Sequence, residues 1–205
     1  MISDRHRLGD AGLDALVRRV AAAAMAGVNL IQIREPDLEG EALVQLVARA
    51  VVAVRQTSAR VVVNDRTDVA LAAGAHGVHL RADSVPAPRV RARVPPGFLI
   101  GRSVHTAEEA ADVTAAGGLD YLVFGTVLPT ASKPGRAAVG IAELRRAVDL
   151  AARLPVLAVG GITVETVRQA QRSGCAGIAA IGLFADGPEA TLPQTVTAAR
   201  SAWED

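Results

Sequence analysis

The amino-acid sequence predicts an α/β protein of the (β/α)8 TIM-barrel class, built as a single domain over residues 1–205. Short β-branched apolar runs alternate with alanine-rich segments of helical period, and Gly, Pro and Asp or Asn residues separate them. Eight such strand–helix units in about 200 residues make a small barrel of this class. An open doubly wound sheet is the main alternative, and the lack of a glycine-rich dinucleotide motif after the first strand disfavours it.

The predicted strands are apolar, short and rich in β-branched residues. Seven segments have this composition: residues 28–33, 60–63, 77–80, 99–101, 121–125, 156–159 and 177–181. An eighth strand is expected over residues 1–3, where only a short stretch of apolar sequence precedes the first charges.

Helices are expected between the strands, at residues 13–26, 40–56, 68–73, 87–93, 107–116, 141–152, 164–173 and 188–202. Three threonines, each followed within three residues by an acid, are the predicted N-caps: Thr67, Thr106 and Thr163. Four glycines are suited to the left-handed turn that ends a helix: Gly27, Gly74, Gly117 and Gly174.

Composition excludes several classes of function. Half of the 205 residues are hydrophobic and the net charge is +1, which suits a soluble domain and gives no basic surface for DNA. Aromatic residues make up only 2%, too few for stacking single-stranded bases. No apolar run reaches the roughly 18 residues that a membrane span needs, and the polar first ten residues are not a signal peptide. With Cys175 as the single cysteine, we expect a cytoplasmic protein with no nucleic-acid or membrane partner.

Polar residues follow nearly every predicted strand, at the barrel end where chemistry takes place in this fold. Gln32 and Arg34 alternate with isoleucines, so both are expected to face the barrel mouth. Arg34 is then either an anion ligand or the ion-pair partner of Glu35. Asn64 and Asp65 offer hard oxygen ligands of the kind that hold Mg²⁺ together with substrate phosphates, although the same pair also suits a turn.

Two later loops have the composition of anion sites. The loop after the sixth predicted strand contains two hydroxyl groups and the only lysine of the chain within four residues: Thr130, Ser132 and Lys133. The last two strands are followed by glycines that allow a phosphate to approach backbone N–H groups: Gly160, Gly161 and Gly182. Solvated loops and tight corners have the same composition, and that alternative stays open.

The four histidines have no metal-ligand spacing. His79 and His105 lie at strand ends, where each either binds a ligand or packs as a structural residue.

Taken together, these segments resemble the thiamine phosphate synthase and thiazole tautomerase superfamily from residue 3 to about residue 184. The segments that carry the resemblance are Gln32-Ile33-Arg34-Glu35, Asn64-Asp65-Arg66 with Asp68, Gly77-Val78-His79-Leu80, Ile100 to His105 with Glu108-Glu109-Ala110, Asp120-Tyr121 with Phe124-Gly125, Pro129-Thr130 with Ser132-Lys133, and Ala158 to Ile162. The family resemblance implies a small barrel that binds thiazole phosphate in thiamin biosynthesis.

The synthase branch joins an aminopyrimidine methyl pyrophosphate to thiazole phosphate, so catalysis is expected to rest on charge neutralisation and positioning. By resemblance, we assign catalytic roles to Arg34, Ser103 and Lys133. The implied ligands of pyrophosphate, Mg²⁺ and thiazole phosphate are Gln32, Arg34, Asn64, Asp65, Ser103, Thr130, Ser132, Lys133, Gly160, Gly161, Ile181 and Gly182. The resemblance also implies a homodimer.

The chain departs from the synthase pattern at two places. Pro36 stands where a lysine is expected, and proline has neither charge nor N–H. After Leu80 the synthases have Gly-Gln and then a second metal-binding Asp, whereas this chain has Asp83 one residue earlier and Ser84 at the expected position. The loss of one cation and one carboxylate either cripples the handling of magnesium pyrophosphate or is compensated by Arg81 and Asp83 through a shift of the loop. We assign Asp83 as the second metal ligand.

The tautomerase branch lacks the same lysine and Asp, but it has a catalytic histidine where Thr126 stands here. A relocated base, His105 or His79, would then be needed. Three hypotheses therefore remain: a synthase, which we favour, a tautomerase-like isomerase, and a non-catalytic binder of thiamin phosphates. A Mg²⁺ requirement separates the first two, because tautomerisation has no pyrophosphate to neutralise.

Overall fold

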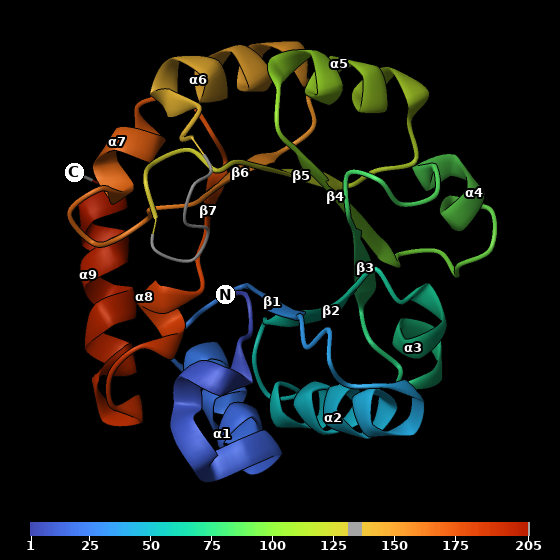
Figure 1. Ribbon diagram of the computed structural model, residues 1–205, viewed down its shortest axis with the longest axis vertical. Helices are drawn as coiled ribbons and strands as arrows, with labels where there is room; N and C mark the ends of the chain where they lie inside the picture. The colour runs from blue at the N-terminus through green and yellow to red at the C-terminus, as the bar shows by residue number, and fades with distance from the viewer. Residues whose placement is uncertain (131–136, 205) are drawn as a thin grey trace. The chain divides into compact units, whose positions relative to one another are not determined.

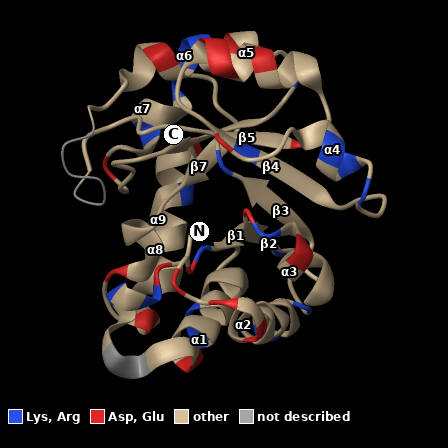
Figure 2. Ribbon diagram, turned by 45° about the vertical axis from the view of Figure 1, so that its right-hand side comes forward, with Lys and Arg blue, Asp and Glu red and all other residues tan. Residues whose placement is uncertain are grey.

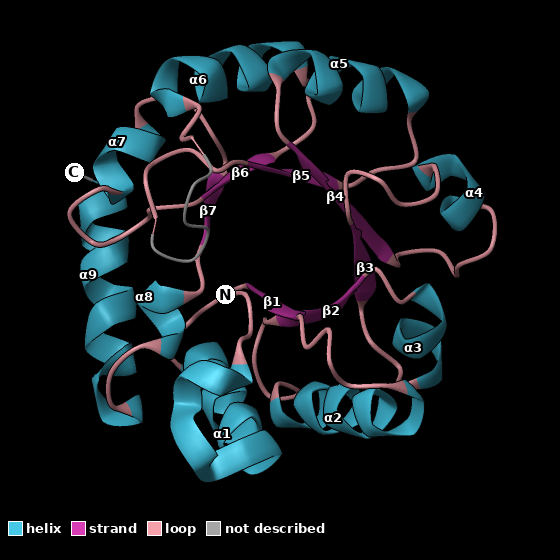
Figure 3. Cartoon of the chain, viewed as in Figure 1, coloured by secondary structure: helices cyan, strands magenta, loops and turns pink. Residues whose placement is uncertain are grey.

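The computed structural model describes residues 1–130 and 137–204. The chain divides into two compact units, Met1–His79 with Ile181–Arg200 and Leu80–Ala180 with Ser201–Asp205. Parallel strands alternate with helices in both units (Figure 3). A single domain over residues 1–205 stays a prediction.

The first unit begins with three parallel strands and the helices that follow them. Its elements are α1 (Gly12–Met25), β1 (Leu30–Ile33), α2 (Gly40–Ala53), β2 (Arg60–Asn64), α3 (Thr67–Ala72) and β3 (Gly77–Leu80). Ile31 pairs with Val61, and Val63 pairs with Val78, so the strand order follows the sequence. In Figure 1, α1 and α2 lie along β1 and β2. Apart from the half-buried Leu30, the apolar side chains of both strands are buried.

The predicted strand at residues 1–3 forms a single parallel bridge, between Ile2 and Gln32. Ser3 N donates to Gln32 O at 2.9 Å, and Gln32 N donates to Met1 O at 2.9 Å. A 3₁₀ helix, η1 (Arg5–Ala11), follows at once and ends the pairing, which is why the segment stays shorter than a strand.

The second unit contains four parallel strands. Its elements are α4 (Ala87–Arg91), β4 (Leu99–Val104), α5 (Ala107–Ala116), β5 (Tyr121–Phe124), α6 (Gly140–Leu150), β6 (Val156–Val159), α7 (Val167–Gln171) and β7 (Gly177–Ala179). β4 is longer than predicted because Ser103 and Val104 continue the pairing with β5. Gly101 of β4 leaves room for the ring of Tyr121 on β5, since a Cβ at Gly101 would lie 2.0 Å from that ring.

The C-terminal part of the chain adds α8 (Gly182–Ala185), η2 (Glu189–Thr191) and α9 (Leu192–Glu204). The predicted strand at residues 177–181 therefore ends at Ala179, and the helix predicted from residue 188 begins at Leu192. None of the described helices has both the length and the apolar composition of a membrane span.

The helix ends confirm part of the capping prediction. Thr106 is the N-cap of α5, and its hydroxyl accepts from Glu109 N at 3.1 Å. The predictions for Thr67 and Thr163 are wrong. α3 already includes Thr67 and has Arg66 as its N-cap, and α7 begins directly after Thr166, whose hydroxyl accepts from Thr163 N at 2.8 Å. The four predicted end glycines all have positive φ, between 66° and 98°.

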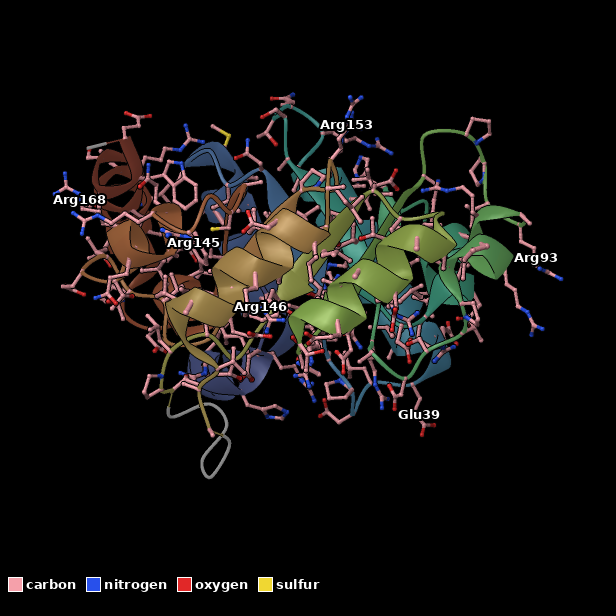
Figure 4. All side chains as sticks on the ribbon, turned by 90° about the horizontal axis from the view of Figure 1, so that it is seen from above. Glu39, Arg93, Arg145, Arg146, Arg153 and Arg168 are labelled. Atoms are coloured by element: carbon pink, nitrogen blue, oxygen red, sulfur yellow. The ribbon has the colours of Figure 1, made fainter. Side chains whose placement is uncertain are left out.

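Ion pairs join neighbouring helices on the outside of the second unit. Arg146 of α6, labelled in Figure 4, donates to Glu108 of α5 at 2.6 Å and to Glu143 of its own helix at 2.8 Å. Figure 2 shows acidic residues along α5 and basic residues on α4. Such exposed pairs orient side chains more than they stabilise the fold.

Candidate active site

Two polar side chains meet where β1 and β2 end. Gln32 is 6% exposed, and its Nε2 donates to Oδ1 of the half-buried Asn64 at 2.9 Å. Gln32 is paired in register with Val62, so Asn64 lies two residues further along β2 on the same face. The structure thus brings together two of the predicted substrate-binding residues.

Arg34 follows β1 and is exposed. Its backbone N donates to Ser3 Oγ at 2.8 Å. Within the described part of the chain, its guanidinium has no hydrogen-bond or ion-pair partner. The ion pair with Glu35 that the sequence left open is therefore absent there, and Arg34 is available to an anion.

Glu35 is buried and belongs to a different cluster. It accepts from Ser3 Oγ at 2.5 Å and from Arg5 Nη1 at 3.1 Å. Arg5 also pairs with Asp37, and that guanidinium holds the pKa of Asp37 far below its usual range. Sequence reasoning missed this network, although Arg5 at the end of the first predicted strand was a visible signal. The network fixes the chain directly before and after Arg34.

Asp65 has φ 59°, a left-handed conformation that is uncommon for a residue with a side chain. Arg66 N donates to Asn64 O at 2.8 Å across this turn, and Asp65 N donates to His79 O at 2.8 Å. A strained backbone that the neighbouring strand holds in place is typical of functional sites. Asp65 therefore has a fixed place beside Asn64.

His79 of β3, whose backbone oxygen accepts from Asp65 N, is 2% exposed. Burial lowers its pKa to about 4, although the negative charge of Asp65 acts in the opposite direction. A neutral, enclosed imidazole with this pKa is a poor general base at neutral pH.

A cleft of about 170 Å³ opens between the loops that follow β1 and β2. Asn64, Asp65 and Arg66 form its polar wall. Its other wall consists of Ile33, Glu35, Pro36, Leu38 and Leu43. Pro36, at the position of the expected lysine, adds apolar surface to the cleft and no charge.

Ile181 and Gly182 lie at the start of α8 in the same unit. A Cβ on Gly182 would lie 2.7 Å from Oδ2 of Asp186, which pairs with Arg7 at 2.8 Å. The exposed carboxylate of Asp186 can move aside, so this contact alone does not require a glycine. Phosphate binding at Ile181 and Gly182 stays a prediction.

In the second unit, Ser103 and His105 lie at the end of β4. Ser103 is half-buried and is paired in register with Val123 of β5. His105 Nδ1 lies 2.5 Å from Gly125 O, and because a carbonyl only accepts, Nδ1 carries the proton. His105 thereby ties the end of β4 to the end of β5.

Gly160 and Gly161, after β6, approach the loop that follows β5. Their φ values are 101° and 66°, and added Cβ atoms would lie 2.5 Å from Thr126 and 2.6 Å from Leu128. Leu128 N donates to Gly160 O at 3.1 Å. Both glycines are required for this close approach, whether or not their N–H groups bind phosphate.

The β5 loop carries the predicted hydroxyl and lysine cluster. Thr126 is buried and Thr130 is half-buried. Ser132 and Lys133 lie outside the described residues.

Asp83 lies in the turn that follows β3, and its carboxylate pairs with Arg81 at 2.6 Å. The turn is closed by Ser84 N, which donates to Arg81 O at 3.2 Å. Arg102 of β4 donates to three carbonyls of the same loop, a contact that sequence reasoning missed.

Among residues 1–130 and 137–204, no group of three or more His, Cys, Asp or Glu side chains forms a metal cage. Mg²⁺ is commonly held by one or two carboxylates together with substrate phosphates, and it keeps several waters. The half-buried carboxylate of Asp65 next to the amide oxygen of Asn64 fits that mode of binding.

The comparisons with known proteins agree with one another. The family model described as "Thiamine monophosphate synthase" matches residues 1–184. The thiamine-phosphate synthase of Roseiflexus castenholzii is 36% identical over 203 residues, covering 97% of this chain and 84% of the relative. That of Methanoculleus marisnigri is 42% identical over 167 residues, covering 78% and 75%. The solved structure of thiamine phosphate pyrophosphorylase from Pyrococcus furiosus has a TM-score of 0.84 at 29% identity, covering 99% and 93%.

The strand and helix order and this structural match define a protein of the (β/α)8 TIM-barrel class, which confirms the predicted fold class. The family match and the identities then establish its particular membership. The chain belongs to the thiamine monophosphate synthase family. These relatives are named as synthases and give the tautomerase alternative no support.

Proposed function

We propose that this protein is a transferase that joins aminopyrimidine methyl pyrophosphate to thiazole phosphate, forming thiamine phosphate and pyrophosphate. The observation that carries the proposal is the arrangement after β1 and β2. There, Gln32 orients Asn64, Asp65 is fixed in a left-handed turn, and the exposed guanidinium of Arg34 has no partner among the residues that the structure describes. This is a set of groups suited to a magnesium pyrophosphate.

The chemistry requires charge neutralisation more than proton transfer. The bond between the methylene carbon and pyrophosphate breaks, the leaving group takes the electron pair, and the thiazole nitrogen lone pair forms the new C–N bond. Mg²⁺, when bound, neutralises the charge that develops on pyrophosphate. Arg34 would bind the same anion, and Asn64 and Asp65 would hold the Mg²⁺ with its pyrophosphate, which keeps the leaving group in position.

The remaining predicted roles belong to the same proposal. Ser103 and Lys133 act on the leaving group, Thr130 and Ser132 are further ligands of the leaving group and the thiazole phosphate, and Asp83 is a second carboxylate for Mg²⁺. The N–H groups of Gly160, Gly161, Ile181 and Gly182 bind thiazole phosphate. Support comes from the family membership and from the half-buried positions of Ser103 at the end of β4 and of Thr130 in the loop after β5.

An isomerase is not proposed. Thr126, at the position of the tautomerase histidine, is 4% exposed, and a hydroxyl does not exchange protons at neutral pH without a base. His79 is enclosed and has a lowered pKa, so it does not replace that histidine.

The test is a product assay with purified protein, both substrates and Mg²⁺, in which thiamine phosphate is oxidised to its fluorescent thiochrome. We expect product that depends on Mg²⁺ and is reduced at least about a hundredfold in Asp65→Asn, because Asn keeps the turn and loses the charge. Asp68→Asn is the matched control, since Asp68 pairs with Arg66 in the next turn. Binding of thiazole phosphate without any product would overturn the synthase and favour the non-catalytic binder.

We further propose a cytoplasmic homodimer whose partners are small phosphate compounds. Light scattering on the purified protein tests the dimer, and a monomer at all concentrations would refute it.

A further inference from the structure

Arg102 of β4 is a buried cation with an unusual set of partners. The residue is 8% exposed. Its Nη2 donates to Ala82 O at 2.6 Å and to Ser84 O at 3.1 Å, and its Nη1 donates to Val85 O at 3.0 Å. All three acceptors are neutral carbonyls of the loop between β3 and α4. Among the described residues its guanidinium has no carboxylate partner.

A buried charge without a counter-ion is costly, and hydrogen bonds to carbonyl dipoles offset that cost. Arg102 therefore stays buried only while the loop keeps its three carbonyls turned toward it. Arg102 in turn holds the loop, because the same hydrogen bonds restrict the backbone conformations of residues 82–85. The conformation of the loop is thus coupled to one side chain on the neighbouring strand.

The loop held in this way is a closed turn that presents Asp83. Ser84 N donates to Arg81 O at 3.2 Å, and Arg81 N donates to Ser84 Oγ at 2.8 Å. The side chain of Asp83 is 70% exposed and contacts Arg81 through Oδ2. Its other oxygen, Oδ1, has no partner among the described residues. The turn directs a carboxylate outward at the position where this chain departs from the synthase pattern.

We infer that Arg102 is a positioning residue, which holds the β3–α4 turn so that Asp83 serves the magnesium pyrophosphate in place of an Asp one residue later. The inference rests on the proposed function, because it assigns the turn to the pyrophosphate end of that reaction. Arg102 itself contacts no substrate in this proposal. It acts through the three carbonyls that it binds.

A purely structural arginine in the same unit provides the comparison. Arg91 is half-buried, donates to Phe98 O at 2.6 Å and pairs with Asp120. Its acceptors lie before β4 and β5 begin, at the opposite end of the strands from Ser103. Arg91→Met should therefore destabilise the protein and leave pyrophosphate binding unchanged.

The experiment measures the binding of inorganic pyrophosphate with Mg²⁺ by calorimetry, together with KM for each substrate. Arg102→Met should weaken pyrophosphate binding and raise KM for the pyrimidine pyrophosphate by about tenfold, as expected for an outer-shell residue. KM for thiazole phosphate should change less than about twofold, a split that general destabilisation would not produce. The pyrophosphate affinity of Arg102→Lys should lie between those of the wild type and Arg102→Met, because one ammonium reaches fewer carbonyls than a guanidinium.

A double-mutant cycle then tests the route through Asp83. Asp83→Ala should weaken pyrophosphate binding about as much as Arg102→Met, and the double variant should lose no more than either alone. The inference would be overturned if the losses of pyrophosphate affinity in Asp83→Ala and Arg102→Met multiply in the double variant. It would also be overturned if folded Arg102→Met or Arg102→Lys keeps the wild-type affinity, or if Arg91→Met loses as much affinity as Arg102→Met. Thermal melts establish which variants are folded, and Asp83→Ala keeps the test available if Arg102→Met does not fold.

Failure of the inference is distinguishable from failure of the proposed function. If the wild type binds magnesium pyrophosphate and the cycle behaves as expected but no thiamine phosphate forms, the proposed reaction is wrong and the positioning role stands. If the wild type makes product and Arg102 variants bind pyrophosphate normally, the reaction stands and the positioning role is wrong.

Discussion

The side-chain amide of Gln32 donates to Oδ1 of Asn64 at 2.9 Å, so that two strand-end residues orient one another. Gln32 is almost fully enclosed, and Asn64 continues β2 by one residue beyond its apolar core. The bond leaves Asn64 a single preferred orientation next to Asp65. A substrate group that binds there meets an amide already fixed in place.

Removing one partner of the hydrogen bond between Gln32 and Asn64 should lower the free energy of unfolding more than removing both partners. Asn64→Leu leaves the buried amide of Gln32 unsatisfied, and we expect the free energy of unfolding to fall by about 1–3 kcal/mol. The double variant Gln32→Leu/Asn64→Leu replaces both groups by apolar ones and should recover most of that loss. Urea unfolding of the three proteins measures this. Equal losses in the single and double variants would show that the bond does not carry the effect.

The left-handed backbone of Asp65 predicts an opposition between stability and activity. Glycine adopts φ 59° without strain, so Asp65→Gly should raise the free energy of unfolding by about 1 kcal/mol while it abolishes thiamine phosphate formation. Ala152, at φ 54°, is the matched control. Ala152→Gly should give a similar gain with unchanged activity. A loss of stability in Asp65→Gly would mean that the carboxylate stabilises the turn.

Much of the strand and helix order could be predicted, because apolar runs bounded by Gly or Pro leave few alternatives. The predicted segments at 77–80, 107–116 and 156–159 coincide with β3, α5 and β6. The prediction of residues 99–101 stopped where the polar residues Arg102 and Ser103 begin. Backbone pairing does not depend on side-chain polarity, and β4 continues to Val104.

The candidate site was predictable only where residues at strand ends meet. That Gln32 and Asn64 meet follows from the rule that parallel strands end at one edge, and the hydrogen bond between them shows this meeting. Their binding of substrate stays a prediction. The partners of Arg102 could not be predicted, because they are backbone carbonyls, which every residue has. Glu35 could have paired with Arg34 or Arg5, and only the fold decides in favour of Arg5.

His79 should make stability depend on pH. Its folded-state pKa of about 4 lies below its ordinary value of 6.5, because burial disfavours the charged imidazole. The unfolded chain therefore binds a proton between these two values and the folded chain does not. The stability from neutral His79 is complete above pH 6.5 and is lost as the pH falls toward 4, by about 3 kcal/mol in all.

His79→Gln removes this titration and keeps a neutral polar side chain. Urea unfolding from pH 7 to pH 4 should show a smaller fall in stability for His79→Gln than for the wild type, because other groups titrate equally in both. The same slope in both proteins would place the folded-state pKa of His79 near its ordinary value.

Gly161 and Gly174 separate the cost of backbone strain from that of crowding. Gly174 has φ 83°, and an added Cβ would meet only Val148 at 3.8 Å. Gly174→Ala should therefore lower the free energy of unfolding by about 1–2 kcal/mol through strain alone. At Gly161, with φ 66°, the Cβ would also lie 2.6 Å from both Leu128 Cβ and Pro129 O. Gly161→Ala should cost about 1–3 kcal/mol more, because the loop after β5 must move.

The same pair of variants reports on the proposed phosphate site. Gly161→Ala keeps the backbone N–H but displaces the loop that carries Thr130, so KM for thiazole phosphate should rise about tenfold relative to the wild type. Gly174→Ala lies before β7 begins and should leave that KM unchanged. Steady-state kinetics at saturating pyrimidine pyrophosphate measures both. If the two variants raise KM equally, loss of stability rather than displacement of this loop is the cause, and Gly161 has no place in thiazole phosphate binding.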